Sequence, residues 1–447
     1  MVGRENALSL IDLALKHSQG DQTEVLLRGE DSYLTRFATN HIHQNVGEKD
    51  ATLAVRVIFG KKIGSASTNT LDEGSVRRTV EKAAEIARLQ RENPDFKSLP
   101  DPSPVPETDG FSRRTAEISP EDRAKAVGAV IAKAKAKGFE AAGAYSTRAR
   151  ELAIGNSLGV RAYHASTGAD LVTVAMSPTS SGYAEQSEVD AARIDPGAVA
   201  DTAVRKCAES VESVKVEPGE YEVILEELAV ANLVGYLARL GFSALGLQEG
   251  RSFLVGKLGQ KIVGENITLW DDGLDPTGIV MPFDFEGVPK EKLTLIEDGV
   301  AKNVVYDSYT AGREPGKRST GHATPGFFGN FGPAPMNLFL KPGDATIEDM
   351  IKSTKRGILV TRFHYTNPIH PVKTIITGMT RDGTFLIEDG KVKGAVKNFR
   401  FTQSVLEAFS NVELIGKTPK LIGGFFGGMS VPALKVGKFN FTGVTEF

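Results

Sequence analysis

The sequence is nearly free of cysteine: Cys207 is the only one among 447 residues. A single cysteine excludes an internal disulfide, and it equally excludes a zinc cluster built on thiolates. Cys207 lies within AVADTAVRKCAESV, a helical pattern in which it is most simply a small buried side chain. Nothing in the cysteine usage therefore points to an oxidising compartment.

Long apolar runs and an excess of basic residues are also missing. No stretch reaches the roughly 18 apolar residues that suggest a membrane span, and MVGRENALSL lacks the apolar core of a signal peptide. The 53 Lys and Arg residues are scattered, and 56 Asp and Glu residues bring the net charge to −3. Nucleic-acid binders carry a basic patch instead. We therefore expect a cytoplasmic protein with no membrane span and no nucleic-acid partner.

The length and composition are those of a globular protein of two or three domains. The chain is 40% hydrophobic and 24% charged. Glu217-Pro218-Gly219 marks a boundary, beyond which turn signals between short apolar runs become frequent. These patterns predict an α+β fold, with an N-terminal α/β domain at 1–217 and a β-rich C-terminal domain with a few helices at 218–447.

The N-terminal half contains two similar successions of strands and a helix. Residues 93–110, rich in Pro, Asp and Ser, predict a linker or a long surface excursion between them. The two parts, 1–110 and 111–217, suggest a duplicated unit with three matched pairs: Asn40 with Asn156, Gly64 with Gly182, and Ala84 with Ala208. Strands are predicted at 24–27, 32–44, 51–59, 63–68, 139–147, 150–155, 159–165 and 169–176, and helices at 5–18, 72–91, 119–138 and 196–213.

Local signals also predict where elements begin and turn. Asp72, Ser119 and Thr346 precede helical patterns and are predicted N-caps. Asp-Gly pairs at 298–299 and 389–390 lie between apolar runs and predict hairpins. Two segments rich in Gly and Phe are predicted to be loops over a core or near a cleft: 325–335 and 423–428.

The rest of the chain is organised around a helix predicted at 227–240. Its apolar stripe repeats at spacings of three and four and consists of Val230, Leu233, Val234, Leu237 and Leu240. The opposite face is small and mildly polar where a surface helix would carry Lys and Glu: Ala231, Asn232, Gly235 and Tyr236. We therefore expect this face to pack against something other than water.

This stretch resembles the start of the C-terminal domain of the TldD/PmbA family. In the TldD branch the helix carries the zinc motif HExxxH, whose His, Glu and His positions fall here on Ala231, Asn232 and Tyr236. Alanine has no ligand atom, asparagine cannot act as a general base, and tyrosine is a poor zinc ligand. The branch's third ligand, a cysteine near the C-terminus, is also missing from LIGGFFGGMSVPALKV. The departure from the motif indicates the PmbA/TldE branch.

Further segments extend the resemblance over most of the C-terminal half. RSTGHATPG resembles the STGHA or STGNA stretches of the PmbA/TldE branch. Family-like runs also occupy 259–276, 283–300 and 376–415, whereas 55–72 carries the weaker likeness of the N-terminal half. The resemblance implies a two-subunit zinc metallopeptidase that acts on peptides, in which a TldD-type subunit carries the zinc and a TldE-type subunit completes the cleft.

The resemblance and the residues together predict a chain that binds peptide but holds neither a catalytic residue nor a metal. We expect no cofactor in this chain, a TldD-type partner in a heterodimer, or a homodimer. The predicted peptide-binding residues are Asn232, Tyr236, Arg318, Ser319, His322 and His364. A Ser–His hydrolase at 319–322 is not expected, because no third group that would orient the histidine is evident in the sequence.

Two alternatives stay open. His364 and His370, on either side of Asn-Pro, could meet on a loop and form a relocated metal site in an independent peptidase. The other alternative is a non-enzymatic protein that modulates DNA gyrase or toxin proteins, a role that older names give to PmbA.

Overall fold

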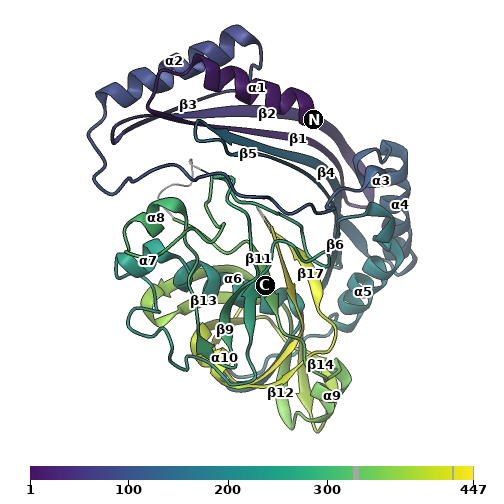
Figure 1. Ribbon diagram of the computed structural model, residues 1–447. Helices are drawn as coiled ribbons and strands as arrows, with labels where there is room; N and C mark the ends of the chain where they lie inside the picture. The colour runs from purple at the N-terminus through teal and green to yellow at the C-terminus, as the bar shows by residue number, and fades with distance from the viewer. Residues whose placement is uncertain (326–331, 425–426, 446–447) are drawn as a thin grey trace.

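The computed structural model describes residues 1–325, 332–424 and 427–445 (Figure 1). An N-terminal sheet domain arches over a β-rich C-terminal domain. The combination of helices and largely antiparallel sheets confirms the predicted α+β fold. Most of the Gly- and Phe-rich stretch at 325–335, and part of that at 423–428, lie outside the described residues. None of the helices formed by the described residues combines the length and the apolar character needed to cross a bilayer.

The N-terminal domain is one antiparallel sheet of six strands in the order β3-β2-β1-β4-β5-β6. Helices cover its outer face, with α1 and α2 over one end and α4 and α5 over the other (Figure 1). The strands are β1 Gln22–Ala38, β2 His41–Phe59, β3 Lys62–Thr68, β4 Glu140–Asn156, β5 Arg161–Met176 and β6 Ser181–Glu188. The helices are α1 Arg4–His17, α2 Glu73–Leu89, α3 Arg113–Ala116, α4 Pro120–Ala136 and α5 Pro196–Glu209.

Two boundaries predicted for the first hairpin are wrong, namely the break within its first strand and the position of its turn. The structure has one continuous strand at 22–38, where two strands with a break at 28–31 were expected. The chain turns at Thr39 and Asn40, inside the predicted strand 32–44, and both residues have positive φ angles of 47° and 61°. Asparagine tolerates this left-handed conformation better than most residues. In the second half, β4 and β5 likewise run through the predicted breaks, and β6 was not predicted.

The predicted helix caps are confirmed. The side chain of Asp72 accepts a hydrogen bond from Ser75 N, and that of Ser119 accepts one from Asp122 N. Thr346 forms a capping box with Asp349 at the start of α9. Side-chain oxygens at these positions satisfy amide groups that have no partner within the helix.

The structure supports a duplicated unit through two glycines of the N-terminal domain. Gly64 in β3 packs against the backbone of α2, and Gly182 in β6 packs in the same way against α5. In each half, therefore, the third strand approaches the following helix more closely than any side chain would permit. The predicted match of Ala84 with Ala208 does not agree with these contacts. Ala83 and Ala203, which meet the two glycines, are 120 residues apart, whereas Ala84 and Ala208 are 124 residues apart. The division at about residue 110 and the boundary at 217 stay predictions.

The described residues of the C-terminal domain form two sheets. One has the order β10-β9-β8-β11-β18-β17. In the other, β12-β7-β19-β15-β13 close into a ring, because β13 also pairs with β12. The strands are β7 Gly219–Leu225, β8 Leu269–Asp271, β9 Leu293–Glu297, β10 Val300–Ala301, β11 Asn337–Leu340, β12 Arg356–His370, β13 Ile375–Glu388, β14 Lys391–Ala395, β15 Phe399–Ser404, β16 Val412–Ile415, β17 Lys420–Gly423, β18 Gly428–Val431 and β19 Leu434–Val444. The helices are α6 Glu227–Gly241, α7 Ala244–Gln248, α8 Ser308–Gly312, α9 Ile347–Lys352 and α10 Val405–Ser410.

Both predicted Asp-Gly hairpins are present. Asp298 and Gly299 connect β9 to β10, and Asp389 and Gly390 connect β13 to β14. All four residues have positive φ angles. This conformation matches the twist of the flanking strands and explains why Asp-Gly is favoured there.

Helix α6 lies in the main core of the C-terminal domain. Four residues of its apolar stripe are buried and Leu240 is half-buried, and on the opposite face Ala231 and Tyr236 are only 5% and 9% exposed. On this second face, Asn232 donates a hydrogen bond to Thr366 of β12 and Gly235 lies against Met429 of β18, which confirms that the face does not face water. Aromatic side chains of the strand ring complete this core, with Phe363 and Phe401 ring centroids 4.5 Å apart.

We predict that Gly64→Ala and Gly182→Ala both destabilise the chain. A Cβ at Gly64 would lie 2.2 Å from Ala83 O, and one at Gly182 would lie 2.1 Å from Ala203 O. Such overpacking against backbone should lower the free energy of unfolding by about 1–3 kcal/mol, as measured by urea denaturation.

Gly128→Ala in α4 is the matched control, since a Cβ there meets nothing within 4 Å. It should raise the free energy of unfolding by about 0.5–1 kcal/mol, through helix propensity. Urea midpoints for Gly64→Ala and Gly182→Ala at or above that of the unchanged chain would contradict the close packing of strand and helix.

Candidate functional site

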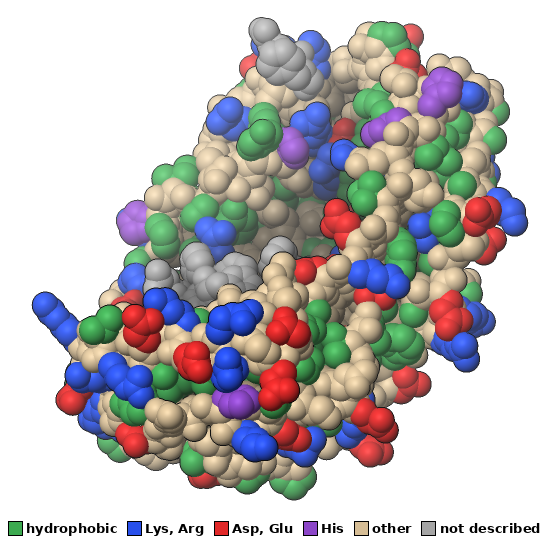
Figure 2. Space-filling model, turned by 90° about the horizontal axis from the view of Figure 1, so that it is seen from above, with side chains coloured by type: hydrophobic (Ala, Val, Ile, Leu, Met, Phe, Trp, Pro, Cys, Tyr) green, Lys and Arg blue, Asp and Glu red, His purple; other side chains and the backbone are tan. Residues whose placement is uncertain are grey.

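A cleft of about 800 Å³ lies between the concave face of the N-terminal sheet and loops of the C-terminal domain. Figure 2 shows the molecule hollowed between its two parts, with Lys, Arg, Asp and Glu side chains on the walls of the hollow. The sheet contributes charged and small polar side chains, and the C-terminal wall contributes mainly apolar ones. The C-terminal residues that line it are Ile279, Val280, Met281, Phe285, Glu286 and Thr324.

The alternation of strand residues explains why the cleft is polar while the sheet has a hydrophobic core. In β1, Val25 and Leu27 are fully buried beneath the helices of the outer face. Their neighbours along the strand point the other way and line the cleft. The residues that β1 and β2 present to the cleft in this way are Glu24, Leu26, Arg28, Glu30, Ser32, Glu48, Asp50, Thr52, Ala54 and Arg56.

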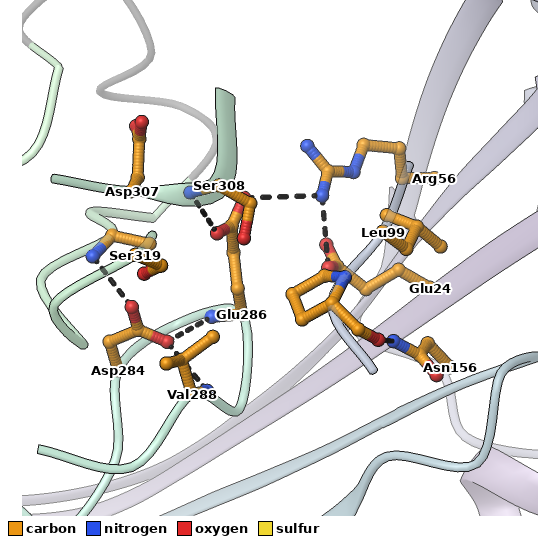
Figure 3. A network of polar contacts seen from close by, with 12 residues as sticks. Glu24, Arg56, Leu99, Asn156, Asp284, Glu286, Val288, Asp307, Ser308 and Ser319 are labelled. Carbon is orange, nitrogen blue, oxygen red and sulfur yellow. Dashed lines mark hydrogen bonds and ion pairs between the residues drawn. The ribbon is translucent and has the colours of Figure 1, made fainter. Parts of the chain in front are cut away.

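At one end of the cleft, the guanidinium group of Arg56 joins the two domains (Figure 3). Arg56 Nη2 lies 2.9 Å from Glu24 Oε2 on the neighbouring strand and 3.6 Å from Glu286 Oε1 on the C-terminal wall. Glu286 Oε2 also accepts a hydrogen bond of 2.9 Å from Ser308 N. Burial raises the pKa of Glu24, and the Glu286 carboxylate adds to this effect while Arg56 opposes it. The two domains therefore share a partly buried charge cluster in which carboxylates outnumber guanidinium groups.

The C-terminal wall is held in shape by Asp284, which is fully buried. Its Oδ1 accepts hydrogen bonds of 2.9 Å from the amides of Glu286 and Val288. Its Oδ2 accepts one of 2.8 Å from Ala323 N. Burial and the nearby Glu286 carboxylate raise the pKa of Asp284, against the three amides, which lower it. One side chain thus fixes both the turn at 284–288 and the loop that follows residue 318.

Behind this wall lies a second buried cluster, centred on Asp271 at the end of β8. Asp271 Oδ1 lies 3.0 Å from Lys290 Nζ and 3.0 Å from His322 Nε2, and all three side chains are fully buried. Asp271 Oδ2 accepts hydrogen bonds of 2.7 Å from the amides of Met336 and Asn337. Burial would raise the pKa of Asp271, but Lys290, His322 and the amides hold it well below its usual value. A buried carboxylate with these partners stays ionised.

The contacts of His322 show which of its nitrogens carries a proton. Nδ1 lies 2.8 Å from the carbonyl oxygen of Thr320, which can only accept, so Nδ1 donates there. Nε2 makes no well-aligned hydrogen bond with Asp271, and burial together with Lys290 lowers the pKa of His322. Nδ1 therefore cannot take a proton from the Thr320 hydroxyl, although Oγ1 lies 3.0 Å away.

Asp271 is the group that sequence reasoning missed when it found no third residue beside the histidine at 322. The two residues are far apart in the chain and share no local pattern, so nothing in the sequence pairs them. Ser319, the serine nearest to His322 in the sequence, donates to the carbonyl oxygen of Tyr306 at 3.3 Å. A hydrolase centred on Ser319 remains without support in these contacts.

The six predicted peptide-binding residues lie in two groups, and none of them lines the cleft. On α6, Asn232 Nδ2 donates to Thr366 Oγ1 of β12 at 3.1 Å, which brings the helix close to the strand that carries His364. Tyr236 is buried on the same helix. The other group follows residue 317: Arg318 is exposed and pairs with Glu291 at 2.9 Å, Ser319 is half-buried, and His322 is fully buried. Their part in binding peptide stays a prediction.

The positions of the zinc motif present side chains that do not fit a zinc ion. Ala231 offers no ligand atom, and the side-chain amide of Asn232 is hydrogen-bonded to Thr366. Tyr236 is a poor zinc ligand, and the sequence has no cysteine near the C-terminus that could supply a thiolate ligand beside it. His364 and His370 lie at two positions of strand β12, not on a loop. In residues 1–325, 332–424 and 427–445, no group of three or more His, Cys, Asp or Glu side chains could hold a metal ion.

Comparisons with known proteins, by sequence and by structure, agree on one family of relatives. The model of the PmbA/TldA metallopeptidase C-terminal domain matches residues 218–443, and that of PmbA/TldA metallopeptidase domain 1 matches residues 23–87. The crystal structure of TldE from Thermococcus kodakarensis is similar with a TM-score of 0.88 at 26% identity, over 97% of this chain and 99% of that chain.

Two curated relatives show the same likeness in sequence. Metalloprotease PmbA of Escherichia coli O157:H7 is 25% identical over 431 residues, which are 92% of this chain and 91% of that protein. An uncharacterised protein of Methanocaldococcus jannaschii is 38% identical over 149 residues, and the match spans only 35% of its length. Because the C-terminal family model alone matches more than half of the residues, the chain belongs to the TldD/PmbA family of metallopeptidases.

Proposed function

We propose that this chain is a TldE/PmbA-type subunit, without a metal of its own, of a two-subunit metallopeptidase that cleaves peptides. The TldD-type partner would hold the zinc, and this chain would hold part of the peptide. We further propose that the assembly works in the cytoplasm. The observation that carries the proposal is the set of residues at the zinc-motif positions of α6, namely Ala231, Asn232 and Tyr236.

The likeness to TldE of Thermococcus kodakarensis supports the same assignment, because it extends over 97% of this chain. The role of the chain follows from what its residues can do. The cleft between the sheet and the C-terminal wall could receive a peptide in extended form, and strand-lined clefts suit this kind of recognition. The chain would orient the peptide and exclude water around it, while bond cleavage would take place on the partner.

We predict that the purified chain contains well under one zinc ion per molecule. The reason is the ligand chemistry of α6, where three positions supply neither an imidazole nor a carboxylate. Elemental analysis after dialysis against dilute zinc would measure this. About one zinc per chain, lost when His364 or His370 is replaced by alanine, would favour an independent peptidase with a relocated site.

We predict that the chain alone does not cleave peptides and that a mixture with a TldD-type subunit from the same cell does. Peptide hydrolysis would be measured for each protein alone and for the two together, with a chelator control. Cleavage by this chain alone that resists the chelator would refute the proposal. A partner that is equally active alone would leave this chain as a regulator, such as a modulator of DNA gyrase or toxin proteins.

Arg318→Ala provides a narrower test within that mixture. The side chain is exposed and its ion pair with Glu291 is solvent-screened, so its loss should change stability by less than about 1 kcal/mol. If the loop at 318–324 holds peptide, the variant should raise KM several-fold while co-purification with the partner is unchanged. His322→Ala is unsuitable for this purpose, because it would break the buried Asp271 cluster. Unaltered kinetics for Arg318→Ala would remove this loop from the peptide-binding surface.

A further inference from the structure

We propose that the cleft binds an extended peptide that carries a bulky apolar side chain and, about four residues along, a lysine or arginine. The inference rests on the proposed function and names the class of peptide that this chain would select. It uses the residues that line the cleft, none of which was predicted as a site residue from the sequence.

An apolar shelf forms the middle of the cleft. Leu26 of β1 and Leu152 of β4 are half-buried and pack against Met281 and Phe285 of the C-terminal wall. Ala54, on the strand next to Leu26, adds a small side chain that leaves room above the shelf. The cleft volume of about 800 Å³ is large enough for a phenylalanine or leucine side chain together with its backbone. A bulky apolar side chain seated here would be removed from water on both sides.

Carboxylates gather on the same strands, four residues beyond the shelf. Glu30 of β1 lies directly opposite Asp50 of β2, and Glu48 lies opposite the next cleft-facing residue, Ser32. Like charges directly opposite each other destabilise a strand pair. Glu30 is paired with Arg150 at 2.7 Å, but among the described residues Glu48 and Asp50 form no ion pair, and both are exposed. A cation bound here would relieve the repulsion.

The other charged side chains that line the cleft do not cancel this excess of negative charge. Arg28 lies between the shelf and the carboxylates. Burial and the neighbouring Arg150 lower the pKa of Arg28, and the Glu30 and Asp50 carboxylates oppose this effect. At the far end, Arg56 is already shared by two glutamates. Glu151 also borders the cleft, but its carboxylate binds the amides of Val2 and Gly3. The cleft-facing side chains therefore comprise five carboxylates and three guanidinium groups, so the cleft attracts positive charge.

The geometry of the strands sets the spacing of the peptide. Leu26 and Glu30 are four residues apart on β1, which corresponds to about 13 Å at the rise of an extended chain. A peptide that runs along the strands has the same rise and the same alternation of side chains. Its apolar and basic side chains would then face the sheet together when they are four residues apart.

The test is direct binding of peptides to the chain alone, measured by fluorescence anisotropy at low salt. The probe is a nine-residue Gly/Ser peptide with phenylalanine at the third position and lysine at the seventh. Its counterparts carry glutamate in place of lysine, or serine in place of phenylalanine. We expect the lysine peptide to bind on the order of tenfold more tightly than the glutamate peptide, with a difference that shrinks as salt is added. The peptide without phenylalanine should bind more weakly than the lysine probe.

The charge-reversed double variant Glu48→Lys/Asp50→Lys should invert the preference, so that the glutamate peptide binds more tightly. Glu92→Lys is the matched control, because Glu92 is an exposed carboxylate that does not line the cleft. Circular dichroism would establish that each variant is folded. Equal affinities for the lysine and glutamate peptides, or an equal shift caused by Glu92→Lys, would overturn the proposal.

The outcomes separate this inference from the proposed function. If the mixture with a TldD-type subunit cleaves peptides but the chain alone shows no preference for lysine, the cleft assignment fails and the subunit role stands. If the chain shows the preference but the mixture does not cleave, the subunit role fails and the binding site stands.

Discussion

The charge of Asp271 is the constraint on which the C-terminal wall of the cleft depends. The negative charge of a carboxylate that is buried away from solvent must be compensated by a positive charge or by hydrogen-bond donors. Removing one partner of a buried ion pair typically destabilises a protein by about 3–5 kcal/mol. Asp271 meets this requirement with the Lys290 ammonium group and two backbone amides, and His322 Nε2 lies 3.0 Å from the same carboxylate. Those partners come from separate segments of the chain, so the ionised group forces the segments to meet. Asp284 repeats the principle nearer the cleft with three amides.

The concave sheet provides the opposite wall by a different physical route. Its long strands alternate between an apolar face that packs on helices and a polar face that lines the cleft. Close contact between sheet and helices is possible because Gly64 and Gly182 lack side chains. Arg56 then connects the sheet to the C-terminal wall through Glu24 and Glu286 (Figure 3). The cleft is therefore defined by ionic contacts at its end and by packing along its sides.

Much of the fold could be predicted because its signals are local. The caps at Asp72 and Ser119 and the two Asp-Gly hairpins each depend on a few neighbouring residues. The stripe of α6 is equally a short-range pattern. Strand β1 was predicted in two pieces because Arg28, Glu30 and Asp31 interrupt its apolar residues. In the structure, Arg28 and Glu30 belong to the cleft face of a continuous strand. In a sequence, therefore, charged strand residues that line a cleft can be mistaken for the residues of a loop.

The candidate site was harder to predict, because its parts are distant in the chain. The resemblance to the family was clearest in the C-terminal half, and every predicted site residue came from there. The cleft instead takes most of its lining from the strands of the N-terminal sheet, and no local pattern pairs those strands with residues 279–286. The contact between Asp271 and His322 was not predicted, for the same reason.

The distribution of strand lengths has a consequence for solubility. The outermost strands of the two open sheets are β3, β6, β10 and β17, with 7, 8, 2 and 4 residues. The strands of 16 to 19 residues all lie inside the first sheet, and the five-stranded ring has no end at all. Long exposed edges are where foreign strands add and fibrils begin. The short outer strands leave part of two long ones uncovered, because β3 pairs only with 53–59 of β2 and β6 only with 169–176 of β5. The open edge of β2 carries Glu48, Lys49 and Asp50, and charged side chains of this kind oppose the addition of a foreign strand.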